Sequence, residues 1–225
     1  MSMWRALRSD AAVYRRLRYP HSTGAWTKVA VWLRPGGLLI LFTQRLGHEV
    51  RRRRCAGSRW TPALLAMRIV YQFAAFASVI VEKADVLRSV DIEPGVYLAD
   101  RGNLIIGARR IGAGTVIHHR VTIGMNSTDP GTPAVGANVW IGPDCVIYGD
   151  ITIGDGATLL PGTVLTRSIP GGTVVQGNPP RVVRTGFDNT PLRSSCACRV
   201  DAASLTLLPA PRPSAHQAAL QLTNA

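Results

Sequence analysis

Two adjacent histidines, His118 and His119, are the side chains of this sequence best suited to chemistry. They are the only histidines between Ile111 and Val183. An imidazole is largely neutral near pH 7, so it can take a proton from a reacting group without much tuning of its pKa. The alternative is that the pair is solvated or packs against another subunit, and the sequence leaves both interpretations open.

The elements that must position this pair belong to a repeat of six residues. Aliphatic anchors recur at Ile111, Ile117 and Ile123, and the spacing returns from Val135 to Leu165. Three such hexads make one triangular coil, and stacked coils bury the anchors in a continuous column. We therefore expect a β-solenoid. His118 and His119 fall at the second and third places of a hexad, so we expect both at a coil corner, pointing outward.

The repeat divides the chain into three parts. We expect an α-helical N-terminal segment over residues 1–88 and the β-helix over residues 89–186. Residues 187–225 are rich in Pro, Ala and Ser with little periodicity, which predicts a disordered tail. Within the repeat, the turn-rich segment Met125–Ala134 fills a gap of two hexads, so the register is kept across it.

The net charge of +13 is located in the helical segment. Residues 1–90 hold 16 Lys and Arg against 4 acids, whereas residues 91–188 hold 7 against 8. The repeat is therefore not basic, and we expect no nucleic-acid partner. The run Arg51–Arg54 lies next to apolar helices, so it could rest on an anionic membrane surface as a peripheral contact.

The longest helix is expected from Thr61, as its N-cap, to about Val86. It is apolar nearly all round, but Arg68 and Gln72 interrupt the run of about 20 apolar residues that a membrane span needs. We favour burial in a helical bundle or an oligomer interface. The N-terminus carries charges where a signal peptide has an apolar run, so a cytoplasmic location is expected.

The four cysteines do not form the framework of a small secreted protein. Cys145 occupies a small-residue place of the repeat and is expected to be buried. Cys196 and Cys198 lack a second ligand pair, so we expect no metal site.

Several segments carry a resemblance to a known family. The block Val135–Val183, with the closing sequence QGNPPRVV, is similar to the hexapeptide acyltransferases. The VTIG of Val121–Gly124 and the SVDIEPG of Ser89–Gly95, after a helical segment, resemble the serine acetyltransferases in particular. The NVWIG of Asn138–Gly142 resembles the sugar O-acetyltransferases of the same superfamily.

This resemblance implies a left-handed parallel β-helix, a homotrimer, and acetyl-CoA lying in the groove between two subunits. It implies a histidine general base at that groove, for which we prefer His119, with His118 as its packing or orienting partner. Asp100 could orient that imidazole from another subunit, or could be a simple turn residue.

The resemblance also suggests which residues meet the co-substrate. Gly124, Gly142 and Pro143 would let the pantetheine arm approach the backbone. Trp140 would line the site beside the thioester of acetyl-CoA. Arg181 and Arg184 would meet the phosphates.

Two departures from the family keep the acceptor open. Asp100 takes the place of the histidine in the Asp-His pair of serine acetyltransferases, and Gly131-Thr132 takes the place of their Arg-His pair. The layout of the chain favours an O-acetyltransferase that resembles serine acetyltransferase and feeds cysteine synthesis, although the two departures count against serine as the acceptor. The alternatives are an O-acetyltransferase for a sugar or polysaccharide precursor and a β-helix scaffold without catalysis.

Overall fold

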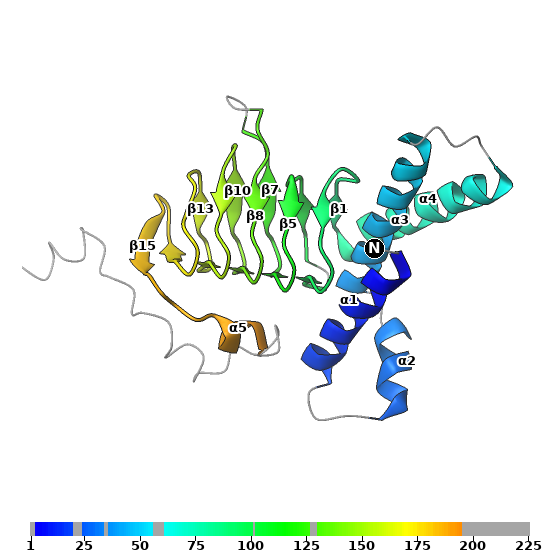
Figure 1. Ribbon diagram of the computed structural model, residues 1–225, viewed down its shortest axis with the longest axis horizontal. Coiled ribbons are helices and arrows are strands. Elements are labelled where there is room, and N and C mark those ends of the chain that lie inside the picture. Colours follow the sequence, from blue (N-terminus) through cyan, green and yellow to red (C-terminus); the bar gives the residue numbers. More distant parts are fainter. Residues whose placement is uncertain are drawn as a thin grey trace, which may run out of the picture.

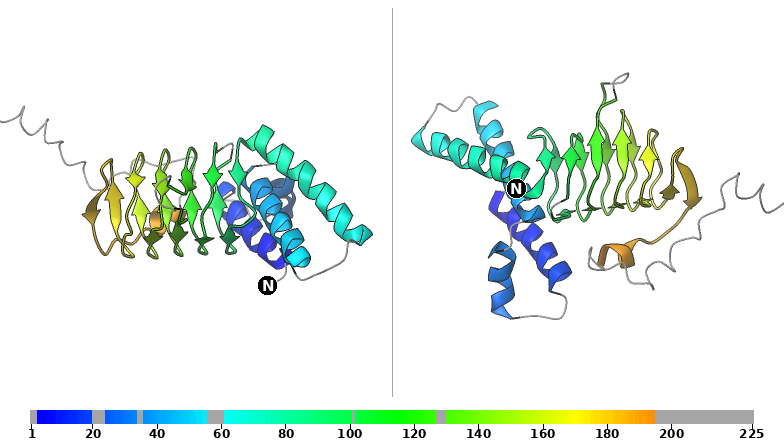
Figure 2. Two further views of the ribbon diagram at one scale, coloured as in Figure 1. Left: turned by 90° about the horizontal axis from the view of Figure 1, so that it is seen from above. Right: turned by 180° about the vertical axis from the view of Figure 1, so that it is seen from behind.

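The computed structural model describes residues 3–19, 24–33, 36–55, 61–100, 102–126 and 130–194. Within these residues a group of helices lies at one end of a stack of short strands (Figure 1). Figure 2 shows that the stack is long and that the hairpin of β14 and β15 closes the end far from the helices.

The strands form three sheets that the chain visits in turn. Sheet A contains β1 (Asp85–Val86), β4 (Ile105–Ile106), β7 (Thr122–Gly124), β10 (Val146–Tyr148) and β13 (Val164–Leu165). Sheet B contains β2 (Asp91–Ile92), β5 (Arg110–Ile111), β8 (Ala134–Val135) and β11 (Thr152–Ile153). Sheet C contains β3 (Tyr97–Leu98), β6 (Val116–Ile117), β9 (Trp140–Ile141), β12 (Thr158–Leu159), β14 (Val174–Gln176) and β15 (Arg181–Arg184).

The pairing confirms the predicted register of the repeat. Ile117 lies opposite Ile141, in parallel strands one coil apart. Ile123 lies opposite Ile147, so the turn-rich segment Met125–Ala134 does not shift the register. The first strand, β1, pairs with β4 and lies before the predicted start of the β-helix at residue 89.

The anchors form the core of the stack. In the strands from β5 to β13 the second residue points inward, and eight of these side chains are fully buried: Ile111, Ile117, Ile123, Ile141, Ile147, Ile153, Leu159 and Leu165. Burying an aliphatic side chain of this size contributes about 1.5–3 kcal/mol. Cys145 is buried as predicted.

The helical part comprises α1 (Met3–Arg18), α2 (Ala25–Leu33), α3 (Gly37–Cys55) and α4 (Pro62–Glu82). Helix α3 continues through the basic run Arg51–Arg54, and ion pairs from Arg52 and Arg53 to Glu49 support this last turn. Helix α4 begins as predicted, because the Thr61 hydroxyl accepts from the Leu64 amide.

Helix α4 ends at Glu82 and not near Val86, because Lys83 takes a left-handed conformation and the chain enters β1. The expectation that α4 is buried in a helical bundle of its own chain is wrong, and the alternative of an oligomer interface stays a prediction. Only Leu64, Ser78 and Glu82 are buried along it. By length and composition alone, α4 could cross a membrane.

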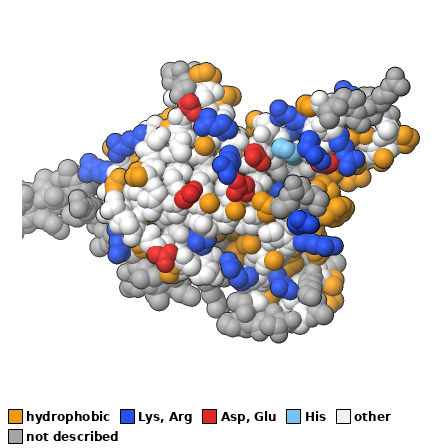
Figure 3. Space-filling model, viewed as in Figure 1, with side chains coloured by type: hydrophobic (Ala, Val, Ile, Leu, Met, Phe, Trp, Pro, Cys, Tyr) orange, Lys and Arg blue, Asp and Glu red, His pale blue; other side chains and the backbone are white. Residues whose placement is uncertain are grey.

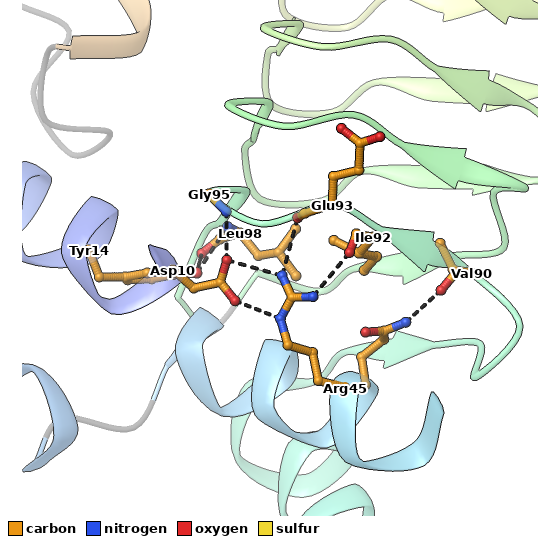
Figure 4. A network of polar contacts seen from close by, with 9 residues as sticks. Asp10, Tyr14, Arg45, Val90, Ile92, Glu93, Gly95 and Leu98 are labelled. Carbon is orange, nitrogen blue, oxygen red and sulfur yellow. Dashed lines mark hydrogen bonds and ion pairs between the residues drawn. The ribbon is translucent and has the colours of Figure 1, made fainter. Parts of the chain in front are cut away.

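A buried ion pair joins the helices to the stack (Figure 4). Arg45 of α3 donates to the Asp10 carboxylate from its Nε at 2.7 Å and its Nη2 at 3.1 Å. It also donates to the carbonyls of Ile92 and Glu93, while Asp10 accepts from the Gly95 amide at 2.8 Å. Both members of the pair thus bind the first coil as well as each other.

The described residues 187–194 of the segment after the stack have defined contacts, which corrects the prediction of a disordered tail for these eight residues. Helix α5 (Thr190–Ser194) turns back along the coils (Figure 1). Asn189 holds this segment, because its side-chain amide donates to the carbonyls of Asn138, Gly156 and Ala157. Cys196 and Cys198 lie outside the described residues.

Candidate functional site

The edge where sheet C turns into sheet A brings together several residues that the sequence singles out. The turns after β3, β6 and β9 stack there, one coil apart. The His118 amide donates to the Ile141 carbonyl at 3.0 Å, and the Asp144 amide donates to the His119 carbonyl at 3.2 Å. The two histidines therefore lie directly beside the Gly142-Pro143 turn, and Asp100 follows β3 in the neighbouring coil on the other side.

His118 does not point into solvent, which corrects the expectation for this residue. Its side chain is only 4% exposed. The ring packs against Trp140, with the ring centroids 4.9 Å apart. Burial, together with the nearby His119, lowers the pKa of His118 to about 4, so the imidazole is neutral at physiological pH.

Two buried side-chain polar atoms among the described residues lack a hydrogen-bond partner within the chain. One is Nε2 of His118 and the other is the hydroxyl of Thr158. Thr158 lies opposite Trp140 in sheet C, on the coil next to the one that carries the Trp140 ring. Leaving such groups unpaired costs about 1–3 kcal/mol each, so this region favours a further hydrogen-bonding group.

His119 is exposed, as predicted, and a pair of opposite charges lies beside it. Arg120 donates to both carboxylate oxygens of Asp144, at 2.5 Å and 2.6 Å. The Arg120 guanidinium, and more weakly His119, hold the pKa of Asp144 below its ordinary value. His119 thus sits at the edge between a neutral, buried imidazole and an ionised carboxylate.

Asp100 has partners within its own chain, and the described contacts include no histidine among them. Its carboxylate forms an ion pair with Arg18 of α1 and accepts from the Gly37 amide at 2.8 Å. These contacts place Asp100 in the junction between the helices and the first coil. A role in orienting a histidine of another subunit stays a prediction.

Trp140 lies on the outer face of sheet C, which other parts of the chain cover. The outer residues of sheet C are buried from Tyr97 to Val174. Helix α1 packs on this side, with the rings of Tyr14 and Tyr97 4.7 Å apart, and the segment that contains α5 follows it. In this chain Trp140 is a packing partner of His118, and its part in lining the site beside the thioester stays a prediction.

The glycines proposed for the co-substrate differ in what surrounds them. A Cβ on Gly142 would meet the main chain of Leu159 and Pro161 at 2.9 Å, so this glycine is needed for coil packing. A Cβ on Gly124 would meet nothing within 4 Å. The space beside Gly124 is therefore open in this chain, which suits the approach of a ligand or another subunit.

Arg181 and Arg184 lie in β15, the last strand of sheet C, and both are exposed. Four strand spacings separate β15 from β6 in the order of the sheet, which corresponds to about 19 Å. The two arginines are therefore far from the histidine pair along the same stack, and the Arg184 guanidinium lies 5.3 Å from the Phe187 ring.

Sequence reasoning missed the residues that cover sheet C. Arg193 donates from Nη1 to the side-chain oxygen of Asn138 at 2.9 Å and from Nε to that of Asn189 at 2.9 Å. No periodicity marks this segment, because it follows the outside of the coils and contributes no anchor. The described residues contain no group of three or more His, Cys, Asp or Glu suited to a metal ion.

Comparison with known proteins confirms that the chain contains a hexapeptide repeat. The model of the family described as bacterial transferase hexapeptide (six repeats) matches residues 133–167. Serine acetyltransferase 2 of Arabidopsis thaliana is 32% identical over 111 residues, which cover 45% of this chain and 34% of that protein. Galactoside O-acetyltransferase of Escherichia coli is 44% identical over 50 residues, which cover 22% of this chain and 25% of that protein.

The chain thus spans about a third or less of the length of these curated relatives. Among solved structures, the serine acetyltransferase of Brucella abortus in complex with coenzyme A has a TM-score of 0.64 and 22% identity. That likeness covers 82% of this chain and 69% of the Brucella chain, and at this identity it concerns the fold. The chain therefore carries the bacterial transferase hexapeptide repeat and is similar, in sequence and in fold, to the serine acetyltransferases.

Proposed function

We propose that this protein is an acetyl-CoA-dependent O-acetyltransferase that acts on a small hydroxyl acceptor. The observation that carries the proposal is the histidine pair at the edge between sheets C and A. His119 is exposed there, and His118 beside it is neutral, with its Nε2 unpartnered among the described residues. The relatives, which are named as acetyltransferases, support the same reaction type.

In this proposal His119 is the general base that takes the proton from the acceptor hydroxyl. A base with a pKa near the working pH contributes about 10²–10⁴-fold to such a reaction. His118 fixes the position of its neighbour through the contact with Trp140 and adds no charge, because burial keeps it neutral. The oxygen that loses its proton would then attack the acyl carbon, the carbon–sulfur bond of the thioester would break, and His119 would return the proton to the leaving sulfur, so that the products are the acetyl ester and free CoA.

Acetyl-CoA supplies the acetyl thioester in this scheme. The open space at Gly124 suits the approach of its pantetheine arm to the backbone. A contact of the arm with the turn at Gly142-Pro143 rests on the resemblance to the acyltransferases, since the next coil fills the Cβ position of Gly142. Arg181 and Arg184, exposed at the far end of the stack, suit its phosphates. The β-helix would wind left-handed, and three chains would assemble so that the groove lies between two subunits.

The acceptor is serine in the first version of the proposal and a sugar hydroxyl in the second. The serine version rests on the similarity to the serine acetyltransferases. The sugar version is favoured by Asp100, which stands in the place of a family histidine and is held by Arg18 and Gly37. It is also favoured by the match to galactoside O-acetyltransferase.

The test measures thiol release from acetyl-CoA with serine and with a panel of sugars, for the wild type, His118→Ala and His119→Ala. We expect release with one class of acceptor and a loss of about 10²–10⁴-fold in His119→Ala. A smaller loss is expected in His118→Ala, because that side chain acts through its neighbour.

Other outcomes have clear meanings. Full activity in both alanine variants would show that the base lies elsewhere. No thiol release with either class, together with no binding of CoA, would leave the chain as a scaffold without catalysis and would refute the proposed function.

A further inference from the structure

Helix α4 presents an apolar surface that its own chain leaves uncovered. Eight of its apolar side chains are between 47% and 73% exposed. They are Leu65, Ile69, Val70, Phe73, Phe76, Val79, Ile80 and Val81. Leu65, Ile69, Phe73, Phe76 and Ile80 follow one another at helical spacings of three or four, so they form one continuous stripe. An exposed apolar surface of this extent marks a site of association.

A cleft with an arginine lining lies beside this stripe. It has a volume of about 620 Å³ and lies between α3, α4 and the turn that follows β1. Its arginines are Arg51, Arg54, Arg68 and Arg88, and none of the described residues that line it is acidic. Arg88 also lies over the Tyr71 ring, 5.5 Å from its centroid. The cleft therefore suits an anionic group such as a phosphate ester, and its volume leaves room for more than the phosphate itself.

The cleft and the stripe adjoin each other on the same helix. Arg68 and Gln72, which line the cleft, come from α4 and alternate along it with the stripe residues Ile69 and Phe73. Figure 3 shows the same combination at the helical end of the molecule, where Lys and Arg side chains gather next to hydrophobic ones. A phosphate in the cleft would thus have apolar surface directly beside it.

The packing of α4 favours a helix that lies along a membrane surface and does not cross it. The Ser78 hydroxyl is 3.1 Å from the Thr43 hydroxyl of α3, and a Cβ on Gly47 would meet the Tyr71 ring at 2.6 Å. Helix α4 is therefore closely packed on α3. If α4 crossed a bilayer, α3 with its run Arg51–Arg54 would have to enter the hydrocarbon as well, which is costly.

Charge favours an anionic surface over a second copy of this helical part. Residues 1–90 carry a net charge of +12, so contact between two such parts would bring like charges together. An anionic lipid surface offers the opposite charge, and each Lys or Arg near it contributes about 1 kcal/mol. The apolar stripe adds burial of the kind that holds amphipathic helices in an interface.

We propose that α4 and the arginine cleft dock this protein on an anionic phospholipid surface. The stripe enters the boundary between headgroups and acyl chains, and the cleft takes the phosphate of a lipid headgroup. The inference is independent of the acetyl transfer proposed above, since the histidine pair lies on the stack of coils and contributes nothing to the cleft.

The test measures co-flotation of the full chain with vesicles of phosphatidylcholine, with and without phosphatidylglycerol. We expect binding only with phosphatidylglycerol, and weaker binding at high salt because the charges are screened. The triple variant Arg54→Gln, Arg68→Gln, Arg88→Gln should bind on the order of a hundred-fold more weakly, at about 1 kcal/mol for each arginine. Phe73→Ser with Phe76→Ser should also reduce binding.

The matched control removes three charges from α1, in the variant Arg5→Gln, Arg8→Gln, Arg16→Gln, and should lose much less binding. An equal loss in the two triple variants would overturn the role of the cleft. Absence of flotation with phosphatidylglycerol would overturn the proposal as a whole. So would a phenylalanine variant that binds vesicles normally but forms a smaller oligomer in sedimentation, because the stripe would then be an interface between copies.

Discussion

One coil corner holds two neighbouring histidines, of which His118 is buried and His119 is exposed. The His118 ring is buried against Trp140 and His119 is exposed, although the two histidines are neighbours in the chain. The hexad register predicts the corner correctly. It does not reveal that Trp140, 22 residues later in sequence, lies on the adjacent coil and covers one of the two rings.

The low pKa of His118 makes the stability of the fold depend on pH. The pKa is about 4 in the folded chain and 6.5 in the unfolded chain, so between pH 6.5 and about pH 4 the unfolded chain takes up the proton and the folded chain largely does not. This group should therefore lower the free energy of unfolding by about 2 kcal/mol between pH 7 and pH 5. Chemical denaturation of the wild type and His118→Gln at both pH values checks this.

The variant His118→Gln should lack that contribution, whereas His119→Gln should keep it. If the wild type and His118→Gln lose the same stability between pH 7 and pH 5, His118 is not buried in its neutral form. Above about pH 8 the histidine should contribute no dependence on pH, since it is neutral in both states.

Two glycines of the coils should respond differently to an added methyl group. A Cβ at Gly154 would meet the main-chain nitrogen of Gly171 at 2.3 Å, whereas a Cβ at Gly124 would meet nothing within 4 Å. Gly154→Ala should therefore lower the thermal unfolding temperature. Gly124→Ala should fold normally but raise the KM for acetyl-CoA, because the methyl group fills space that the proposed function gives to the pantetheine arm.

Steady-state kinetics beside thermal denaturation separates these effects. An unchanged KM in Gly124→Ala would remove Gly124 from the co-substrate site. An unchanged unfolding temperature in Gly154→Ala would mean that the adjacent coils can move apart.

At the scale of elements, the junction between the helices and the first coil depends on the pair Asp10–Arg45. Burial raises the pKa of Asp10, while Arg45 and the Gly95 amide oppose that rise. In Arg45→Gln a buried carboxylate would lose its counter-charge, which costs about 3–5 kcal/mol. We expect the midpoint of urea denaturation to fall and hydrogen exchange in α1 to accelerate.

The matched control for Arg45→Gln is Arg52→Gln, on the same helix. Arg52 pairs with Glu49 at the surface, so its replacement should leave both measurements unchanged. Equal behaviour of the two variants would mean that the buried pair does not hold the helices to the stack.

Local sequence signals predict where the helices begin better than they predict what packs against them. Thr61 with Pro62 marks the start of α4, and the structure places it there. The sequence does not show that most of α4 is uncovered and that α3 is its main packing partner, because an apolar helix looks the same whether a bundle, a membrane or another copy covers it. For this reason the sequence predicts burial of α4 in a helical bundle, which the structure does not show.

At the scale of the whole molecule, the three sheets differ in what covers them. The outer face of sheet C is buried under α1 and the segment that contains α5, whereas outer residues such as Ile105 of sheet A and Arg110 of sheet B are exposed. The open sheets are the faces through which the proposed trimer would form, and the histidine edge borders one of them. Sedimentation equilibrium should give three times the chain mass of 24.2 kDa.

A mass of 24.2 kDa in that experiment would contradict the trimer and would place the whole site within one chain. The measurement should be repeated with Phe73→Ser and Phe76→Ser. We expect the same mass, because α4 is assigned to a lipid surface and not to the contact between copies.

The sequence alone determined the register, the core and the corner that holds His118 and His119. The physical reason is that a period of six residues fixes which side chains face inward, whatever lies elsewhere in the chain. Only the tertiary structure decided which histidine is buried, that Asp100 binds Arg18, and that residues 187–194 cover sheet C. Those outcomes depend on contacts between distant segments, which no local pattern encodes.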